Sequence, residues 1–131
     1  MSIEVERRHN NRLIIVHFIG PLDFGEYQQF VLQIHAELYD QAKQPIHTVL
    51  DLSRVSGFPR NVISNALSVS KLKHPNDGLI FFVADNSVIY RFLEIFVRLS
   101  KDPNHIIMRT VDAAVMQIEA ALLKEPATQL R

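Results

Sequence analysis

The stretch that most constrains the fold is residues 46–67, which read IHTVLDLSRVSGFPRNVISNAL. Its first part, residues 46–52, is a mainly apolar run, as is typical of a central strand. The run ends in Asp-Leu and is followed by Ser53. A short loop follows, and we expect a helix to open at Pro59, because a proline in the first turn loses no hydrogen bond there. A strand, a turn and a helix in succession indicate an α/β domain, whose ligands and contacts usually lie at the carboxyl ends of the strands.

Two strands are expected before this stretch. Residues 3–8 alternate apolar and charged side chains, which predicts a half-exposed strand at an edge of the sheet. Residues 9–11, His-Asn-Asn, supply the turn of a hairpin. Residues 12–19 are mostly apolar at both odd and even positions, so both faces of this second strand should be covered, and it is expected in the interior of the sheet.

Polar residues that accept hydrogen bonds from backbone N–H groups indicate where helices begin. Asp23, with Glu26 three residues later, forms a variant capping box for the first helix. Ser87 is expected to cap a helix that runs to about Ser100, and Thr110 to cap the last helix. A third interior strand is expected over residues 79–84 and a short last strand over residues 106–109.

The predicted element order is ββαβαβαβα over residues 1–123, which we interpret as a single domain followed by a frayed polar tail over residues 124–131. Successive strand–helix units predict an α/β fold with a mainly parallel five-stranded sheet in sequential order. The first strand is expected to join antiparallel at one edge, and the helices to lie mostly on one face.

Charge and composition argue against several classes of function. The chain has 14 basic and 14 acidic residues, so no long-range field favours binding to nucleic acid or to an anionic membrane. Without Cys, it has no disulfide, thiol nucleophile or thiolate metal site. The apolar runs are too short to span a membrane and the first ten residues are too polar for a signal peptide, so we expect a cytoplasmic protein.

Patterns typical of catalysis or metal binding are weak. The six His residues lack the i, i+3 or i, i+4 spacing of helical metal ligands. His17 and His47 are candidates for neighbours on adjacent strands, and we interpret them as hydrogen-bonded strand residues. Asp51 is expected to bond backbone N–H groups of the adjacent loop rather than to accept a phosphoryl group. We therefore predict a protein that is not an enzyme and that binds no cofactor or metal.

Three short motifs, in order and spacing, resemble one known family. They are Gly20-x-Leu22-Asp23, Asp51-Leu52-Ser53-x-Val55 and Thr110-Val111-Asp112-Ala113-Ala114. Over nearly the whole chain they resemble the STAS domain, the fold of bacterial anti-sigma-factor antagonists. The resemblance implies a STAS-like fold and a non-catalytic regulatory or scaffolding module. Its partner would be a protein, such as an anti-sigma kinase-like or sensor protein.

The sequence departs from this family at the phosphorylation switch. In the antagonists an Asp-Ser pair stands at the start of the second helix, where a partner kinase phosphorylates the Ser; the aligned positions here are Pro59 and Arg60. Ser56 and Ser64 lie nearby but do not occupy the equivalent turn. We therefore expect no such switch, and take Arg60, Asn61 and Ser64 as candidate partner contacts. The same three residues also fit a solvated helix face.

The helix over residues 87–100 suggests a second contact. Its apolar residues cover about 220° of the helical wheel, whereas a helix buried on one side needs little more than about 100°. The flank of Tyr90, Leu93 and Val97 is therefore expected to face water and to form a homodimer or another protein interface. In an alternative interpretation, the chain is a small-molecule or lipid-binding domain of the related Sec14-type fold, and apolar residues of this helix line a cavity.

Overall fold

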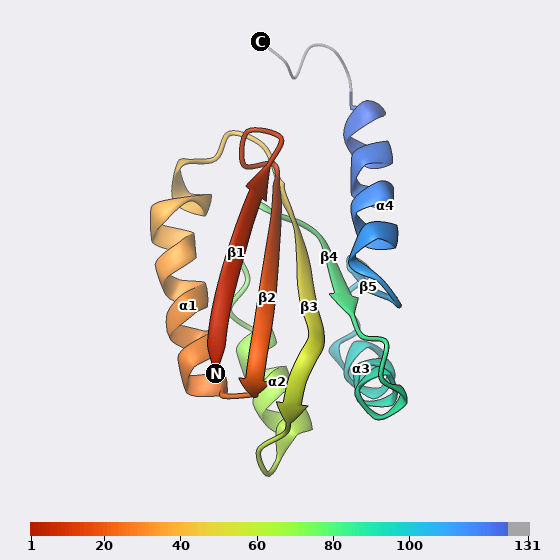
Figure 1. Cartoon of the computed structure of the whole chain (residues 1–131). Coiled ribbons are helices and arrows are strands. Elements are labelled where there is room, and N and C mark those ends of the chain that lie inside the picture. Colours follow the sequence, from red (N-terminus) through yellow and green to blue (C-terminus); the bar gives the residue numbers. More distant parts are fainter. Residues whose placement is uncertain (126–131) are drawn as a thin grey trace.

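The computed structural model describes residues 1–125 and arranges them around one sheet (Figure 1). Strands and helices alternate after an opening pair of strands, as the sequence predicts. The elements are β1 (Ser2–Arg8), β2 (Leu13–Pro21), α1 (Phe24–Glu37), the short 3₁₀-helix η1 (Tyr39–Gln41), β3 (Ile46–Gly57), α2 (Val62–Ser70), β4 (Asp77–Val83), α3 (Ser87–Ser100), β5 (His105–Met108) and α4 (Val111–Leu123).

The strand order confirms the predicted sheet. The five strands lie in the order β1-β2-β3-β4-β5, with β1 antiparallel to β2 and every later pair parallel. The hairpin between β1 and β2 turns through His9, Asn10 and Asn11, all at positive φ. Asn and His tolerate this left-handed region better than most residues, which is why this short polar segment can reverse the chain.

Three helices cover one face of the sheet and α4 covers the other (Figure 1). Alternate residues of β2 divide between the two sides: Ile14, Val16 and Phe18 face α1, α2 and α3, whereas Leu13 and Ile15 join the core beneath α4. The prediction that helices lie mostly on one face is thus confirmed. Because α4 packs on β3, β4 and β5, the α4 side of the sheet is open over much of β1 and β2.

Local capping signals predicted two helix starts correctly and one wrongly. The Asp23 carboxylate accepts a hydrogen bond from the Glu26 N–H at 3.0 Å, and the Thr110 hydroxyl accepts one from the Ala113 N–H at 3.1 Å. At α3 the cap is Asn86 instead of Ser87. Its side-chain oxygen accepts from the N–H groups of the two residues that follow Ser87.

The helix expected to open at Pro59 begins three residues later, at Val62. β3 continues to Gly57, well past the predicted end at residue 52. Asn61 then takes the left-handed conformation, with φ 56° and ψ 38°, through which a right-handed helix cannot continue. Pro59 and Arg60 therefore belong to a loop, and the helix forms only after it.

The end of the described chain is held to the hairpin. Glu125 forms a two-pronged ion pair with Arg12, whose guanidinium also donates to the Pro45 carbonyl at 2.9 Å. The tail predicted to fray from residue 124 is thus anchored at Glu125, and the rest of that prediction, residues 126–131, lies outside the described residues. Within residues 1–125, no helix has the length and apolar character needed to cross a membrane.

Candidate functional site

The structure brings Arg60, Asn61 and Ser64 together at the carboxyl edge of the sheet. All three are exposed, in the loop after β3 and on the first turn of α2. The Ser64 hydroxyl donates to the Asn61 carbonyl at 3.1 Å, and no side chain caps the helix. The loop between β3 and α2 is held against α3, because the Phe58 ring packs on Phe92 with 4.8 Å between centroids.

This contact aligns the loop with the first turn of α3. Residues four apart lie on the same helix face, so Val88 lies one turn before Phe92 toward the helix N-terminus. Val88 is 72% exposed, the largest exposure of an apolar residue on α3. We call the set of Arg60, Asn61, Ser64 and Val88 the carboxyl-edge surface. It combines a cation and polar groups, from the loop before α2 and the first turn of α2, with an exposed aliphatic side chain on the neighbouring α3.

The expectation that Leu93 faces water is wrong. Leu93 is 1% exposed and lies in the core beneath α1, α2 and α3, while Val97 is half-buried against the same core. Tyr90 is also half-buried, and the Arg109 guanidinium lies 3.6 Å above its ring. The wide apolar arc of α3 is covered by the sheet, by α2 and by the end of β5, so the predicted homodimer through this flank loses its structural basis.

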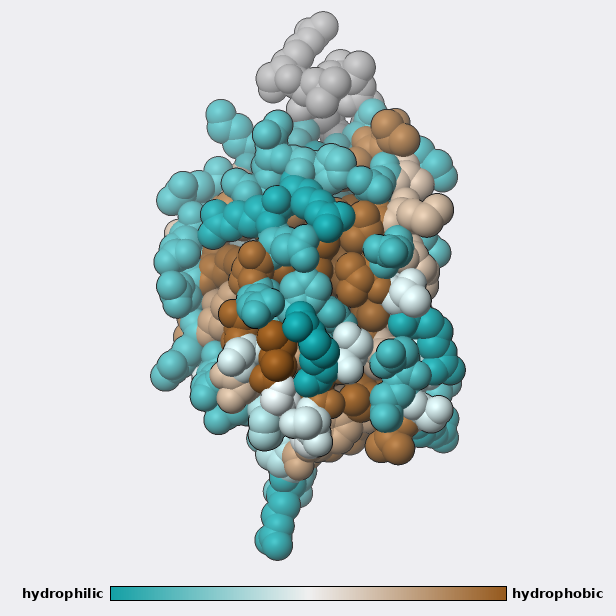
Figure 2. Space-filling model, viewed as in Figure 1, coloured by the Kyte–Doolittle hydropathy of each residue, from teal (hydrophilic) through white to brown (hydrophobic). Residues whose placement is uncertain are grey.

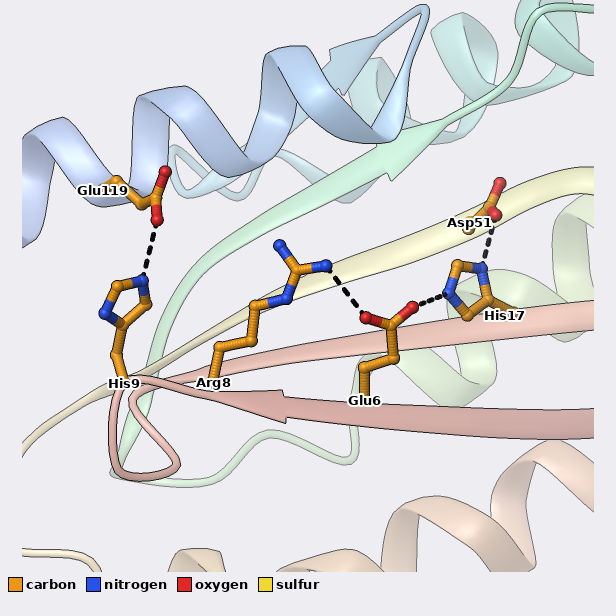
Figure 3. Close-up of polar contacts among 6 residues, drawn as sticks. All are labelled: Glu6, Arg8, His9, His17, Asp51 and Glu119. Carbon is orange, nitrogen blue, oxygen red and sulfur yellow. Dashed lines mark hydrogen bonds and ion pairs between the residues drawn. The ribbon is translucent and has the colours of Figure 1, made fainter.

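A second group of polar side chains lies on the open half of the sheet. His17, in β2, stands opposite Asp51 of β3 and not opposite His47, which pairs with Leu13. His17 Nδ1 lies 2.6 Å from an Asp51 carboxylate oxygen, and Nε2 lies 2.9 Å from Glu6 of β1. Arg8 extends this chain by donating to Glu6 at 2.9 Å (Figure 3).

This open-face cluster of Glu6, Arg8, His17 and Asp51 joins β1, β2 and β3 and extends from the exposed side of β1 to the buried Asp51. Burial by itself lowers the pKa of His17, but the hydrogen bonds that its ring donates to the Glu6 and Asp51 carboxylates outweigh this effect and raise the pKa above its ordinary value. Burial by itself raises the pKa of Asp51, but hydrogen bonds from Ser53 and His17 outweigh this effect, so the pKa is lowered.

Figure 2 shows the molecule from the same side as Figure 1, with hydrophilic residues across this side and apolar surface among them.

The open-face cluster has the geometry of a structural link and not of a catalytic dyad. Both ring nitrogens of His17 are occupied by carboxylates, which leaves no lone pair to accept a proton from a nucleophile. Asp51 also accepts from the Ser53 N–H at 3.0 Å, as expected from the sequence, but its bond to His17 was not predicted. The sequence does contain a signal for the contact of His17 with Glu6. Alternate residues of a strand share a face, so the two residues lie on the same face of the sheet once the hairpin register is known.

The remaining histidines form hydrogen bonds and ring contacts. His47 Nδ1 accepts from the Leu79 N–H at 2.9 Å, and burial lowers the pKa of His47. Among residues 1–125, no group of three or more His, Cys, Asp or Glu residues has an arrangement that could hold a metal ion.

A cavity of about 380 Å³ lies between the sheet and the three helices on its α1 side. The helix α2 has nine residues whereas α1 and α3 have 14 each, and the non-helical segment that follows α2, residues 71–76, contributes Leu72, Lys73 and His74 to the cavity wall. Apolar residues from every surrounding element line it, among them Val16, Leu50, Ala66, Phe92, Leu93 and Phe96. Sequence patterns give no direct signal for a cavity, because they record which residues face inward and not how well they fill the space.

Polar groups line one part of the cavity wall. The Tyr39 hydroxyl and the Thr48 hydroxyl lie 2.8 Å apart, and burial raises the pKa of Tyr39 to about 12. The rings of His35, Tyr39 and His74 contact one another, with 5.0 Å from the His35 centroid to each of the other two, and burial lowers the pKa of His35. His35 forms no hydrogen bond to any of residues 1–125, so its nitrogens are available at the cavity wall.

Comparisons with known proteins agree on the architecture. No protein-family model matches the sequence, and no curated protein is similar to it in sequence. Among solved structures, a protein of the DUF3478 family with a SpoIIAA-like fold from Shewanella loihica matches with a TM-score of 0.64 at 12% identity, over 89% of this chain and 92% of that one.

Two anti-sigma factor antagonists match in the same way. Unphosphorylated SpoIIAA has a TM-score of 0.63 at 13% identity, over 91% of this chain and 97% of its own. An antagonist from Mycobacterium paratuberculosis has a TM-score of 0.61 at 19% identity, over 90% of this chain and 93% of its own. These likenesses lie in the course of the backbone, and together with the strand order and the helix layers they establish that this chain has the STAS-like fold of the anti-sigma factor antagonists.

Proposed function

We propose that this chain is a non-catalytic regulatory module that binds a protein partner through the carboxyl-edge surface. The fold supports a module of this kind, because two of the matching structures are anti-sigma factor antagonists. The partner class that follows is an anti-sigma kinase-like or sensor protein, met in the cytoplasm.

The observation that carries the proposal is the exposed Val88, one helical turn from Phe92, on which the loop that holds Arg60 packs. Phe58 fixes this loop to α3, so the surface is preformed and little ordering is needed on binding. An exposed aliphatic side chain surrounded by polar groups fits the centre of a small interface with a polar rim. The short loop and the two helix starts are also on the sheet edge where α/β domains usually make their contacts.

The module is proposed to act without the serine switch of the antagonists. Arg60 stands in the exposed loop, two residues before the start of α2, and carries no hydroxyl. Ser56 is exposed near the end of the strand β3, and the Ser64 hydroxyl already donates a hydrogen bond to the Asn61 carbonyl. We expect regulation to come from the amount or state of the partner and not from phosphate on this surface.

Site-specific photocrosslinking tests the proposal. A benzoylphenylalanine at position 88 is expected to crosslink one protein in cells of the source organism, and the same residue at Met116 is not. Met116 is a matched control, since it is 70% exposed on α4, on the opposite side of the sheet.

The crosslinked protein is then purified and titrated with the chain. The Arg60→Glu variant is expected to bind at least about tenfold more weakly, which corresponds to about 1.4 kcal/mol. Equal crosslinking from positions 88 and 116, or unchanged affinity of the Arg60→Glu variant, would contradict the carboxyl-edge surface as the binding site. The alternative function, ligand binding, concerns the cavity and is independent of this surface.

A further inference from the structure

We infer that the cavity between the sheet and helices α1 to α3 is a binding site for a small uncharged amphipathic molecule, with an apolar body and one hydrogen-bonding group. The inference rests on the cavity alone and not on the carboxyl-edge surface. Three observations support it: the volume of the cavity, the distribution of apolar and polar residues on its wall, and the charges of the lining residues.

The volume and apolar lining fit a ligand better than an incompletely packed core. Protein interiors are normally filled to the density of organic crystals, and voids larger than a water molecule are few. The space of about 380 Å³ falls in the range of small-molecule sites. Side chains of Leu50, Phe92 and Leu93 face it from the sheet and from α3, so an apolar body would be enclosed by hydrocarbon.

The polar part of the wall supplies a place for one hydrogen-bonding group. His35 has free ring nitrogens beside the hydroxyl pair of Tyr39 and Thr48. Burial lowers the pKa of His35, so the ring is neutral at pH 7 and offers one donor and one acceptor. A ligand hydroxyl, amide or amine N–H fits this position, because it can bond without requiring a counter-charge.

The charges along the cavity wall disfavour an anion. Among the described residues that line the cavity, Lys73 is the one Lys or Arg, and its ammonium is paired with Asp102 at 3.0 Å. Asp77 adds a second carboxylate to the same wall. Asp40, outside the wall, lies 2.7 Å from the His74 ring. A carboxylate or sulfonate would thus meet more negative than positive charge, and it would lose hydration without gaining a free cation.

Two fluorescent probes of nearly equal shape test both parts of the inference. N-phenyl-1-naphthylamine is uncharged and carries one N–H, whereas 1-anilinonaphthalene-8-sulfonate has the same ring system with an added sulfonate. The full chain is first passed over a lipophilic resin, which removes apolar molecules carried through purification. We expect one-to-one saturable binding of the amine, and binding of the sulfonate that is at least about tenfold weaker.

Variants place the probe in the molecule. Ala66→Phe and Val69→Phe each project a ring from α2 into the cavity and are expected to abolish binding. Ala120→Phe makes the same change on the exposed side of α4 and is expected to bind the amine as the wild type does. Circular dichroism melting shows which variants are folded, and Val69→Phe, at a half-buried position, serves if Ala66→Phe is not.

The outcomes separate cleanly. Absence of saturable binding of the amine, or binding that a folded cavity variant leaves unchanged, overturns the site. Sulfonate binding as tight as that of the amine overturns the assignment of an uncharged ligand. Neither result bears on the crosslinking experiment at position 88, so this inference and the proposed protein contact fail or stand separately.

Discussion

Replacing Leu93 with Ala tests whether α3 is an interior helix or an interface. Leu93 is 1% exposed, so the change removes three buried carbon groups, worth about 2.4 kcal/mol at about 0.8 kcal/mol each. The cavity beside Leu93 makes relaxation around the lost side chain incomplete, and we expect a total destabilisation of about 2–4 kcal/mol. Leu99→Ala is the matched control on the same helix. Leu99 is 50% exposed, and its loss should cost less than about 1 kcal/mol.

Urea denaturation followed by circular dichroism measures both free energies of unfolding. With a denaturant slope of about 2 kcal/mol per molar, Leu93→Ala should lower the midpoint by about 1–2 M and Leu99→Ala by less than about 0.5 M. Sedimentation of the same samples reports the oligomeric state. Equal midpoints for the two variants, or a stable Leu93→Ala monomer formed from a dimeric wild type, would refute the interior position and restore the interface.

Further predictions concern the space beside Gly78, the hydrogen bonds of His17 and the missing acceptor serine. A Cβ added at Gly78 would lie 2.5 Å from His47 Nδ1, so Gly78→Ala should cost about 1–3 kcal/mol in thermal unfolding, whereas Gly57→Ala, which meets nothing within 4 Å, should change stability by less than about 1 kcal/mol. Asp51→Asn removes a carboxylate that holds the proton of His17, so an NMR titration should show a lower pKa for His17; an unchanged value would assign the shift to Glu6 alone. The protonated ring of His17 stabilises the wild type below about pH 6.5, and this contribution is lost as the pH rises through the raised pKa of the folded state. Incubation with an anti-sigma-type kinase and ATP should leave the chain unphosphorylated by mass spectrometry, and stoichiometric phosphate on Ser56 or Ser64 would show that the acceptor has moved.

The parts of the fold that the sequence predicted are those set by short-range chemistry. Alternation and breaker residues locate each strand, and Asp23 and Thr110 cap their helices because the bonds involved span three residues. The sequential sheet follows from the element order and the consistent hand of parallel crossovers.

The errors concern contacts between distant segments. The start of α2 is set by the left-handed Asn61, in a loop whose Phe58 packs on Phe92, 34 positions away. The burial of Leu93 depends on α2 and β5 together. A helical wheel counts apolar residues but does not show how many neighbours surround the helix. His17 meets Asp51 because of the register between β2 and β3, which alternation alone leaves open.

The sequential strand order also determines how this chain can form its sheet during synthesis. Each strand pairs with its nearest neighbour in the sequence, so the sheet can grow by adding one strand at a time in the order of synthesis. Pairing between consecutive strands keeps contact order lower than it would be if crossovers skipped a strand. The ion pair of Arg12 with Glu125 connects the first hairpin to the end of α4, so it can close only when the last helix has docked. Docking of α4 would then be the final folding step, and loss of Glu125 would speed unfolding more than it slows folding.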